Sequence, residues 1–552
     1  MEQHAMHEVD LNSPHNMNTI SQTNITENDV DTMTSSAVDL KKQLTNTNNA
    51  KPSTINNISA NFKQLFIFVQ YPYCLWLIIG NEFCERFSFY GFKTILSLYL
   101  LKFLNFSEDD ATAGVHAFIF LAYFTPILGG WLSDSILGKY WTITSLSMVY
   151  CLGQIVISVT AIPGVTGTPP HWWGALIGLI LVAFGTGGIK PCVSSMGADQ
   201  LSSSKPEVVT SFFAIFYFSI NTGSTLSTFF TPLIRNRFGY AIAFAVPACL
   251  LCFATLLFVI GYKWYHHVPP TGIRNNVFLQ LMKVVVCAVR NRFKIPRKPV
   301  RHWLDRAKSD YSKEMVYDVK CVFRVCKVLL PIMVFWSLFD QHSTRWVFQA
   351  ARMDRTVGSF TFTADQITTL NPLMVILLVV VFDRVIYTTA AKFTKVTPLR
   401  KIAVGLLFTC ASFIASTILE VFIVKNKTGP IHIVWQLPQY ILLVIGEILV
   451  SVTGLEFAYS QAPVYYKGVM QSFYLFTVSM GNIIVFIVAK LPVLPRSMAL
   501  RQAYEFSFFA FLMFLTFLLF IQISRKYKYR KSQVTVMTLP AIEELDDVSI
   551  KS

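Results

Sequence analysis

The chain has 552 residues, and 47 Lys and Arg against 31 Asp and Glu give a net charge of +16, which on a soluble protein would suggest nucleic-acid binding. Hydrophobic residues, however, make up 53% of the chain and charged residues only 14%, where a soluble domain has roughly 25%. With a mean hydropathy of +0.48, this composition argues against a soluble enzyme or a nucleic-acid-binding protein and indicates a chain that lies mostly in lipid.

The first 65 residues are typical of a disordered tail. They are rich in Asn, Thr and Ser and contain no apolar run that a signal peptide would need. The ten cysteines lie in or beside apolar runs, so neither a disulfide framework nor a metal site is expected. The sequence also contains no nucleophile and base arrangement or phosphate loop, and we predict no enzyme and no cofactor.

Twelve apolar segments follow, each long enough to cross a bilayer, for which about 20 residues suffice. They cover residues 66–100, 112–133, 141–161, 172–195, 211–232, 239–262, 323–348, 366–388, 399–423, 432–459, 467–490 and 502–524. The chain is therefore predicted to be an all-α polytopic membrane protein, with transmembrane bundles of six helices at 66–262 and 323–524.

A basic linker, 263–322, joins the two predicted bundles, and its HWLDRAKSDY stretch could form an interfacial helix. Between residues 263 and 327 there are fifteen Lys and Arg but four Asp and Glu. Cytoplasmic flanks retain basic residues, so the linker, the first tail and the tail at 525–552 are all predicted to be cytoplasmic. Two six-helix halves indicate the major facilitator fold, whose substrate site lies near the midplane between the halves.

The segment GWLSDSILGKY between the second and third spans resembles the signature of the major facilitator superfamily in its glycines, Asp134 and Lys139. Glycines permit a tight loop between packed helices, and a carboxylate there can meet a helix N-terminus or a basic group of the other half. We therefore interpret Asp134 as part of a conformational gate.

The first span contains NEFCERFSFYG, with Glu82, Glu85 and Arg86 on one helical face and Lys93 two turns further. Each charged side chain at this depth costs about 2.5 kcal/mol or more unless it pairs with another charge or faces water. Two charges of each sign in one short stretch exceed what a structural ion cluster requires, and we predict a functional site here.

Other polar and aromatic side chains occur inside the predicted spans. Those in the first half are His116, Tyr123, Lys190, Tyr217 and Asn221, and those in the second half are Phe335, Trp336, Asp340, Asn371, Glu447 and Glu456. Glu447 and Glu456 are nine residues apart and so lie on opposite faces of a helix; Glu456 is nearer a polar stretch and is preferred. The intramembrane positive charges Arg86, Lys93 and Lys190 come from the first half and the unpaired negative charge, Glu456, comes from the second. This polarity suits a zwitterionic ligand.

Six strings, in order along the twelve spans, together resemble the proton-coupled oligopeptide transporter family, in particular its animal members. They are NEFCERFSFYG with its E-x-x-E-R signature, GGWLSDSILGKY, FGTGGIKPCVSSMGADQ, FFAIFYFSIN, FWSLFDQ followed by Arg345-Trp346, and SVTGLEFAYSQAP. The resemblance implies a symporter that imports di- and tripeptides together with protons by alternating access, and that works as a monomer in the lipid bilayer.

The resemblance also assigns roles. Peptide binding is implied for Arg86, Tyr90, Lys93, Tyr123, Lys190, Tyr217, Asn221, Phe335, Trp336, Asn371 and Glu456. Proton coupling is implied for Glu82, Glu85 and His116, and gating for Asp134, Arg324, Asp340 and Asp383.

Three features depart from the family. Lys93 replaces the usual Arg, Phe89 replaces one of two frequent tyrosines, and the loop KNKTGP at 425–430 stands where vertebrate members carry a large extracellular domain. A nitrate or other small-anion carrier and a nutrient-sensing receptor stay open as alternatives. We expect a plasma-membrane location, with Asn105 and Asn426 as external glycosylation acceptors in N-x-S/T sequons.

Overall fold

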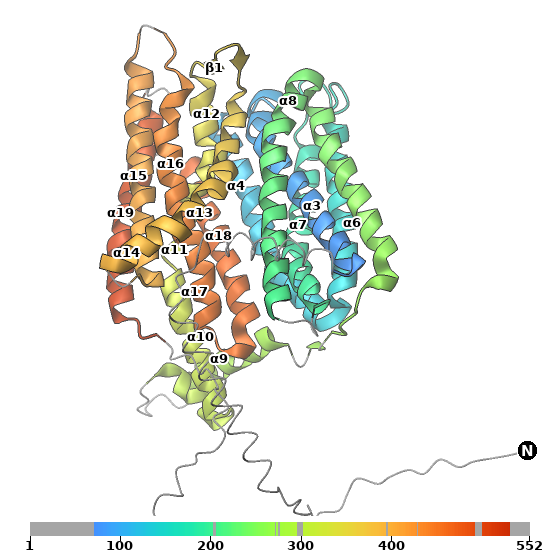
Figure 1. Cartoon of the computed structure of the whole chain (residues 1–552), viewed down its shortest axis with the longest axis vertical. Helices are drawn as coiled ribbons and strands as arrows, with labels where there is room; N and C mark the ends of the chain where they lie inside the picture. The colour runs from blue at the N-terminus through green and yellow to red at the C-terminus, as the bar shows by residue number, and fades with distance from the viewer. Residues whose placement is uncertain are drawn as a thin grey trace, which may run out of the picture. The chain divides into compact units, whose positions relative to one another are not determined.

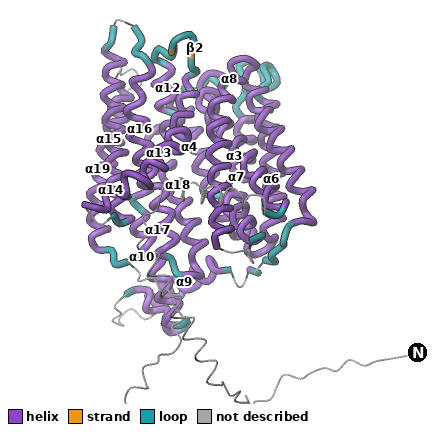
Figure 2. The backbone as a smooth tube through the Cα atoms, in the orientation of Figure 1, coloured by secondary structure: helices purple, strands orange, loops and turns teal. Residues whose placement is uncertain are grey.

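The computed structural model describes residues 71–201, 206–270, 272–273, 276–294, 302–393, 396–427, 429–491 and 500–529. The predicted tail at 1–65 and almost all of the tail at 525–552 lie outside these residues, as does Thr428 of the second sequon. The regular secondary structure of the described part is helical apart from one short hairpin, and loops connect the helices (Figures 1 and 2).

The first half contains the elements α3 (Tyr73–Leu98), η2 (Tyr99–Phe103), α4 (Glu108–Phe124), α5 (Pro126–Leu132), η3 (Ser133–Leu137), α6 (Gly138–Thr160), α7 (Trp173–Asp199) and α8 (Pro206–Ile260). The linker contains η4 (Gly261–Trp264), α9 (Val277–Lys294) and η6 (Trp303–Ser309). Figure 1 shows α9 at one end of the helices, here called the linker end, and the hairpin strand β1 at the opposite end, here called the far end.

The second half begins with α10 (Lys313–Leu329), α11 (Ile332–Phe339), η7 (Asp340–Ser343), α12 (Arg345–Ala351), β1 (Thr356–Val357), β2 (Phe360–Thr361), η8 (Ala364–Thr369), α13 (Leu370–Val381), η9 (Phe382–Ile386) and α14 (Tyr387–Phe393). It continues with α15 (Pro398–Lys425), η10 (Ile433–Gln436), α16 (Leu437–Glu447), η11 (Ile448–Val452), α17 (Thr453–Gln461), η12 (Val464–Tyr466), α18 (Lys467–Lys490) and α19 (Arg501–Lys526). β1 and β2 pair antiparallel.

Eight helical segments among the described residues are long and apolar enough to cross a membrane, or nine if the bent pair Lys313–Leu329 and Ile332–Ala351 is one span. Two of the eight, Glu108–Thr160 and Ser211–Trp264, exceed fifty residues, and each contains two predicted spans. Glycines with positive φ, Gly138 at 75° and Gly239 at 85°, interrupt them. Helix α3 is not among these eight segments because it carries four charged side chains. The twelve predicted segments therefore all correspond to helices.

The linker differs from the prediction. The HWLDRAKSDY stretch forms the short 3₁₀ helix η6, while the longer helix α9 was not anticipated. Lys308 and Lys320 each place Nζ 2.6 Å from Asp305 Oδ1. Burial would raise the pKa of Asp305, but the hydrogen bonds and charges of these lysines outweigh it and hold the pKa at about 2. Asp305 thus fastens η6 to α10 at any physiological pH.

Small residues permit a close helix crossing between α6 and α7 in the first half. A Cβ added to Gly185 of α7 would come 2.4 Å from Tyr150 Cβ and 2.8 Å from Tyr150 N on α6. The neighbouring atoms belong to the backbone and its first carbon, so they cannot rotate away. Close packing through small residues is the usual way in which membrane helices approach one another.

Replacing Gly185 with alanine is therefore expected to lower the melting temperature of the purified protein in detergent. The cost is about 1–3 kcal/mol of overpacking. Gly80→Ala is the matched control, since a Cβ at Gly80 of α3 meets nothing within 4 Å. That change should be neutral or stabilising by up to about 1 kcal/mol. Equal melting temperatures for the two variants would contradict the tight crossing.

Candidate functional site

The E-x-x-E-R motif forms a compact ion cluster on α3. Arg86 Nε lies 2.7 Å from Glu82 Oε1 and 2.9 Å from Glu85 Oε2, and all three side chains are buried. Thr186 of α7 donates a hydrogen bond of 2.7 Å to Glu85 Oε1. The prediction that the three charges share one face is confirmed. One guanidinium faces two carboxylates, so the cluster carries a net negative charge and can take up a proton.

Lys190 carries the unpaired cation of this region. Its Nζ is buried and has no hydrogen-bond partner among the described residues. The ammonium lies 3.8 Å from the ring centroid of Tyr123 and 4.2 Å from that of Phe89. Tyr123 in turn packs against the core of the second half. Among the described residues, the Lys190 ammonium therefore contacts aromatic faces at the boundary between the halves and makes no hydrogen bond. It can bind an anionic ligand group there.

The acidic side of the site differs from the prediction. Glu447, at the end of α16, accepts a hydrogen bond of 2.7 Å from Asn371 Nδ2 on α13. Tyr90 lies within electrostatic range of both Arg86 and Glu447. Glu456 lies nine residues further on and is exposed on α17. Asn371 thus bonds Glu447 in this structure, and the predicted part of Glu456 in holding the peptide ammonium stays a prediction.

The three aromatic residues Tyr217, Trp336 and Phe335, predicted to line the site, differ in their exposure. Tyr217 of α8 is 47% exposed, and Trp336 of α11 buries an Nε1 that has no partner among the described residues. Phe335 is fully buried in the core of the second half, so the prediction that it lines the site is not supported. Asn221 turns back on its own helix, with Nδ2 donating to the carbonyl of Tyr217 at 2.9 Å.

A second cluster joins the halves directly. Lys93 Nζ lies 2.7 Å from Asp340 Oδ1, and Asn482 Nδ2 donates to Asp340 Oδ2 at 2.8 Å. His116 places Nδ1 2.7 Å from Asn482 Oδ1 and Nε2 3.1 Å from Thr344 Oγ1. Lys93 is thus engaged with Asp340 rather than presented to a ligand, which corrects the prediction that it contributes to carboxylate binding in this state.

Asn482 and Thr344 were missed by sequence reasoning. Both are uncharged; Asn482 lies in the apolar helix α18 and Thr344 at the turn between η7 and α12, and a single amide or hydroxyl in an apolar span is more often packed than functional. The sequence feature that could have identified Asn482 is its position deep in an apolar span, because it is the sole Asn, Gln or charged residue between Gln471 and Lys490.

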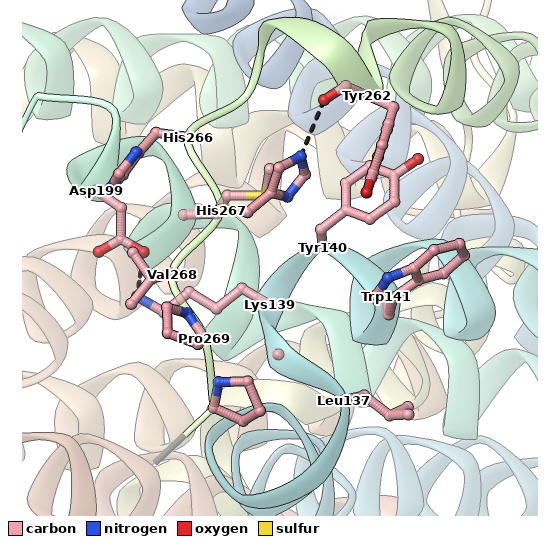
Figure 3. Close-up of a pocket in the computed structure, with 13 residues that line it drawn as sticks. Leu137, Lys139, Tyr140, Trp141, Asp199, Tyr262, His266, His267, Val268 and Pro269 are labelled. Carbon is pink, nitrogen blue, oxygen red and sulfur yellow. Dashed lines mark hydrogen bonds and ion pairs between the residues drawn. The ribbon is translucent and has the colours of Figure 1, made fainter. Parts of the chain in front are cut away.

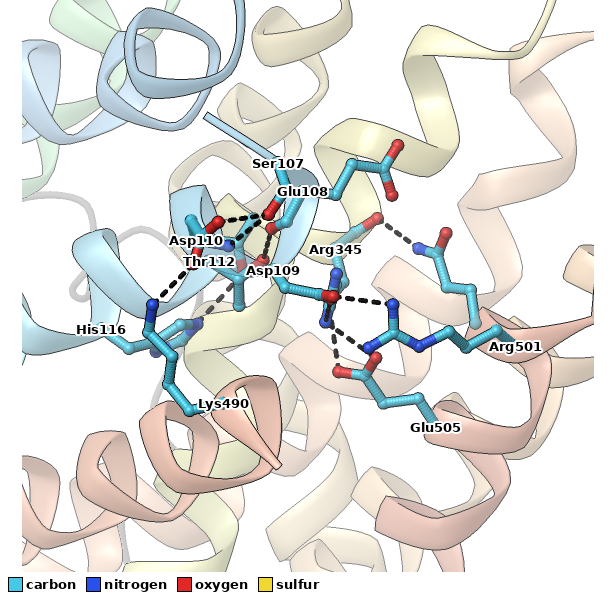
Figure 4. A network of polar contacts seen from close by, with 12 residues as sticks. Ser107, Glu108, Asp109, Asp110, Thr112, His116, Arg345, Lys490, Arg501 and Glu505 are labelled. Atoms are coloured by element: carbon cyan, nitrogen blue, oxygen red, sulfur yellow. Dashed lines mark hydrogen bonds and ion pairs between the residues drawn. The ribbon is translucent and has the colours of Figure 1, made fainter. Parts of the chain in front are cut away.

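The far end holds a further set of ion pairs between the halves (Figure 4). Asp109 at the start of α4 lies 2.9 Å from Arg345 Nη2 and 2.7 Å from Arg501 Nη1, and Glu505 lies 2.8 Å from Arg345. Arg235 of α8 also pairs with Asp365 of η8. These contacts close the far end of the boundary between the halves.

Replacing Asp109 with asparagine should open the far end. The change removes two charge-assisted bonds between the halves, worth about 1.5–3 kcal/mol each, while Arg345 keeps Glu505. Maleimide labelling of a cysteine introduced at the buried Ser343 of purified protein is expected to accelerate by about tenfold. Glu108→Gln, at the exposed neighbour, should leave the labelling rate unchanged. A rate unaltered by Asp109→Asn would show that these pairs do not hold the halves together.

Figure 3 shows Leu137, Lys139 and Tyr140 of the superfamily-like loop around a pocket that Asp199 and His266–Pro269 also line. Gly138, with φ of 75°, turns the chain into α6, and Lys139 lies 2.5 Å from Asp199 of α7. Asp134 is exposed in η3, within electrostatic range of Lys139. Arg324 is exposed on α10, and the side chain of Asp383 lies outside the described residues. The predicted gating roles of Asp134, Arg324 and Asp383, and that of Asp340, stay predictions.

The fold and these clusters define a polytopic membrane protein whose two helical halves meet across paired charges. The chain belongs to the POT family, whose family model matches residues 140–505. The resemblance inferred from the motifs is thereby confirmed.

Relatives and solved structures agree with this assignment. The chain is 43% identical over 403 residues to solute carrier family 15 member 2 of Homo sapiens, covering 70% of this chain and 54% of that protein. It is 41% identical over 385 residues to human solute carrier family 15 member 1, covering 66% of this chain and 54% of that protein. The chain thus spans about half the length of the curated relatives it matches.

Two solved structures are similar over nearly their whole length. The POT family transporter PepTSo has a TM-score of 0.71 at 32% identity, with 83% of this chain and 98% of that chain covered. An auto-inhibited POT family peptide transporter has a TM-score of 0.72 at 31% identity, with 84% and 98% covered. The fold predicted from the sequence is therefore confirmed.

Proposed function

We propose that this protein is a symporter that imports di- and tripeptides together with protons by alternating access. The observation that carries the proposal is the unpaired ammonium of Lys190 on one side of the boundary and the Glu447 and Asn371 pair on the other. A peptide with free ends carries one charge of each sign and matches both sides. The name of one similar solved structure, a peptide transporter, supports the same substrate class.

In this proposal the peptide carboxylate meets Lys190, with Arg86 and its glutamates nearby, and the peptide ammonium meets Glu447. Tyr90 and Tyr123 lie between these sides, and Trp336 offers a buried Nε1–H to the peptide backbone. Aromatic walls accept side chains of different shapes because they recognise area rather than one hydrogen-bonding pattern.

Protons are proposed to act through Glu82, Glu85 and His116. Two carboxylates sharing one guanidinium can take up a proton, and His116 bonds to the same asparagine as Asp340. A proton on His116 would place a second positive charge beside Lys93 and weaken the contact between the halves. The closed far end corresponds to a state that opens toward the linker end.

The linker end is proposed to face the cytoplasm of the plasma membrane, because basic flanks are retained on that side. Both termini then lie inside, and the protein works as a monomer in the bilayer.

Uptake of a labelled dipeptide into proteoliposomes tests the proposal. An inward proton gradient is expected to raise accumulation, and an inside-negative potential should raise it further by about 2.3 kcal/mol per charge per 100 mV. Nitrate uptake is the parallel arm. Flux of nitrate without flux of peptide would establish an anion carrier instead, and binding of peptide without any flux would indicate a receptor.

A further inference from the structure

A lipid-facing groove lies where the two halves meet near the far end. It is formed by α4 and α7 of the first half and α18 of the second, and its volume is about 540 Å³. This falls in the range of roughly 300–1,000 Å³ that small ligands occupy. Two of its lining residues, Asp110 and Lys490, carry charge, and the remaining ones are apolar.

One wall of the groove is lined by small residues. Ala113, Gly114 and Ala117 present small side chains on one face of α4, and the ring of Phe486 belongs to the α18 side. A Cβ at Gly114 would come 2.9 Å from the Leu100 side chain, so this wall is already tight. A rigid ring system loses little conformational freedom on binding such a surface, whereas a flexible acyl chain loses much more.

The mouth of the groove offers a matched pair of polar groups. Lys490 Nζ lies 2.6 Å from Asp110 Oδ1, and both side chains are partly exposed (Figure 4). An ammonium has three donors, so Lys490 can bond Asp110 and a ligand oxygen together. A ligand hydroxyl can accept from Lys490 and donate to Asp110, whereas a carboxylate or phosphate would be repelled by Asp110. The pair therefore favours a neutral hydroxyl over an anionic headgroup.

We propose that this groove binds a membrane sterol, with the ring system on the small-residue face of α4 and the hydroxyl at the Asp110 and Lys490 pair. Both halves contribute walls, so the sterol bridges them beside the Asp109 and Arg345 contacts. A ligand that binds one arrangement of the halves stabilises that arrangement. The sterol thus stabilises the state in which the far end is closed.

The test uses the purified full chain in nanodiscs with a photoreactive diazirine sterol. Labelling is expected to be saturable, to map by mass spectrometry to α4 and α18 near Phe486, and to be blocked by excess unlabelled cholesterol. Leu176→Trp fills the groove and should reduce labelling at least about fivefold. Ile177→Trp is the matched control, because Ile177 is exposed on the same helix but does not line the groove.

Lys490→Gln provides a second test at an exposed position where misfolding is not a concern. In the unaltered protein cholesterol should compete about fivefold better than cholestane, which lacks the hydroxyl, and the two should compete more nearly equally in the variant. A diazirine fatty acid is the competing probe. Equal labelling of Leu176→Trp and Ile177→Trp, label spread over all lipid-facing helices, or groove labelling by the fatty acid alone would overturn the proposal. These readouts need no peptide flux and are independent of the proposed transport.

Discussion

Glu447→Gln is expected to reduce dipeptide uptake by about ten- to a hundredfold, through a higher KM. A charge-assisted hydrogen bond to the peptide ammonium is worth about 1.5–3 kcal/mol, and each 1.4 kcal/mol is a factor of ten. Glutamine keeps the size of the side chain and can still accept the hydrogen bond from Asn371, so the helix contact should survive. Initial rates in proteoliposomes over a range of peptide concentrations give the measurement.

Two controls make this prediction specific. Glu456→Gln removes the same charge from an exposed position on α17 and should transport like the unaltered protein. An N-acetylated dipeptide carries no ammonium, so its competition should be equally weak in the unaltered protein and in Glu447→Gln. If Glu456→Gln were the defective variant, the acidic side of the proposed site would be assigned to the wrong glutamate.

The choice between Glu447 and Glu456 shows where sequence reasoning reached its limit. Their spacing of nine residues predicts opposite faces on an ideal α-helix, but the π-helical segment η11 lies between them and changes that angle. Which of the two carboxylates meets the first half depends on how α16 packs against α13, where Asn371 lies. The helices themselves were predictable, because long apolar runs leave few alternatives in a bilayer.

Pairing between distant helices was the other feature that sequence could not supply. The partners Lys93 and Asp340 are 247 residues apart, and His116 and Asn482 are 366 apart. Each was visible as a polar residue in an apolar span, except that Asn482 and Thr344 looked like ordinary packing residues. The local contact of Arg86 with Glu82 was by contrast correctly predicted from i, i+4 spacing.

His116→Gln is expected to abolish proton-driven accumulation of peptide while leaving exchange of peptide across the membrane intact. His116 Nδ1 faces the Asn482 amide oxygen, an acceptor, and therefore carries the hydrogen, so the hydroxyl of Thr344 donates to Nε2 in the neutral form. A proton arriving at Nε2 makes Thr344 turn its hydrogen away, toward the carbonyl of Gln341 at 3.4 Å. The added charge then acts on Asp340 through Asn482.

Glutamine at 116 preserves hydrogen bonding but cannot titrate, so the variant separates proton coupling from packing. Uptake under an inward proton gradient should fall at least about tenfold, and its pH dependence should flatten, while counterflow stays within about twofold. His342→Gln is the matched control, because His342 is also buried in this region but bonds only the carbonyl of Phe339 among the described residues. An unchanged pH profile in His116→Gln would transfer proton coupling to Glu82 and Glu85, since these carboxylates share Arg86 and form the remaining proposed proton site.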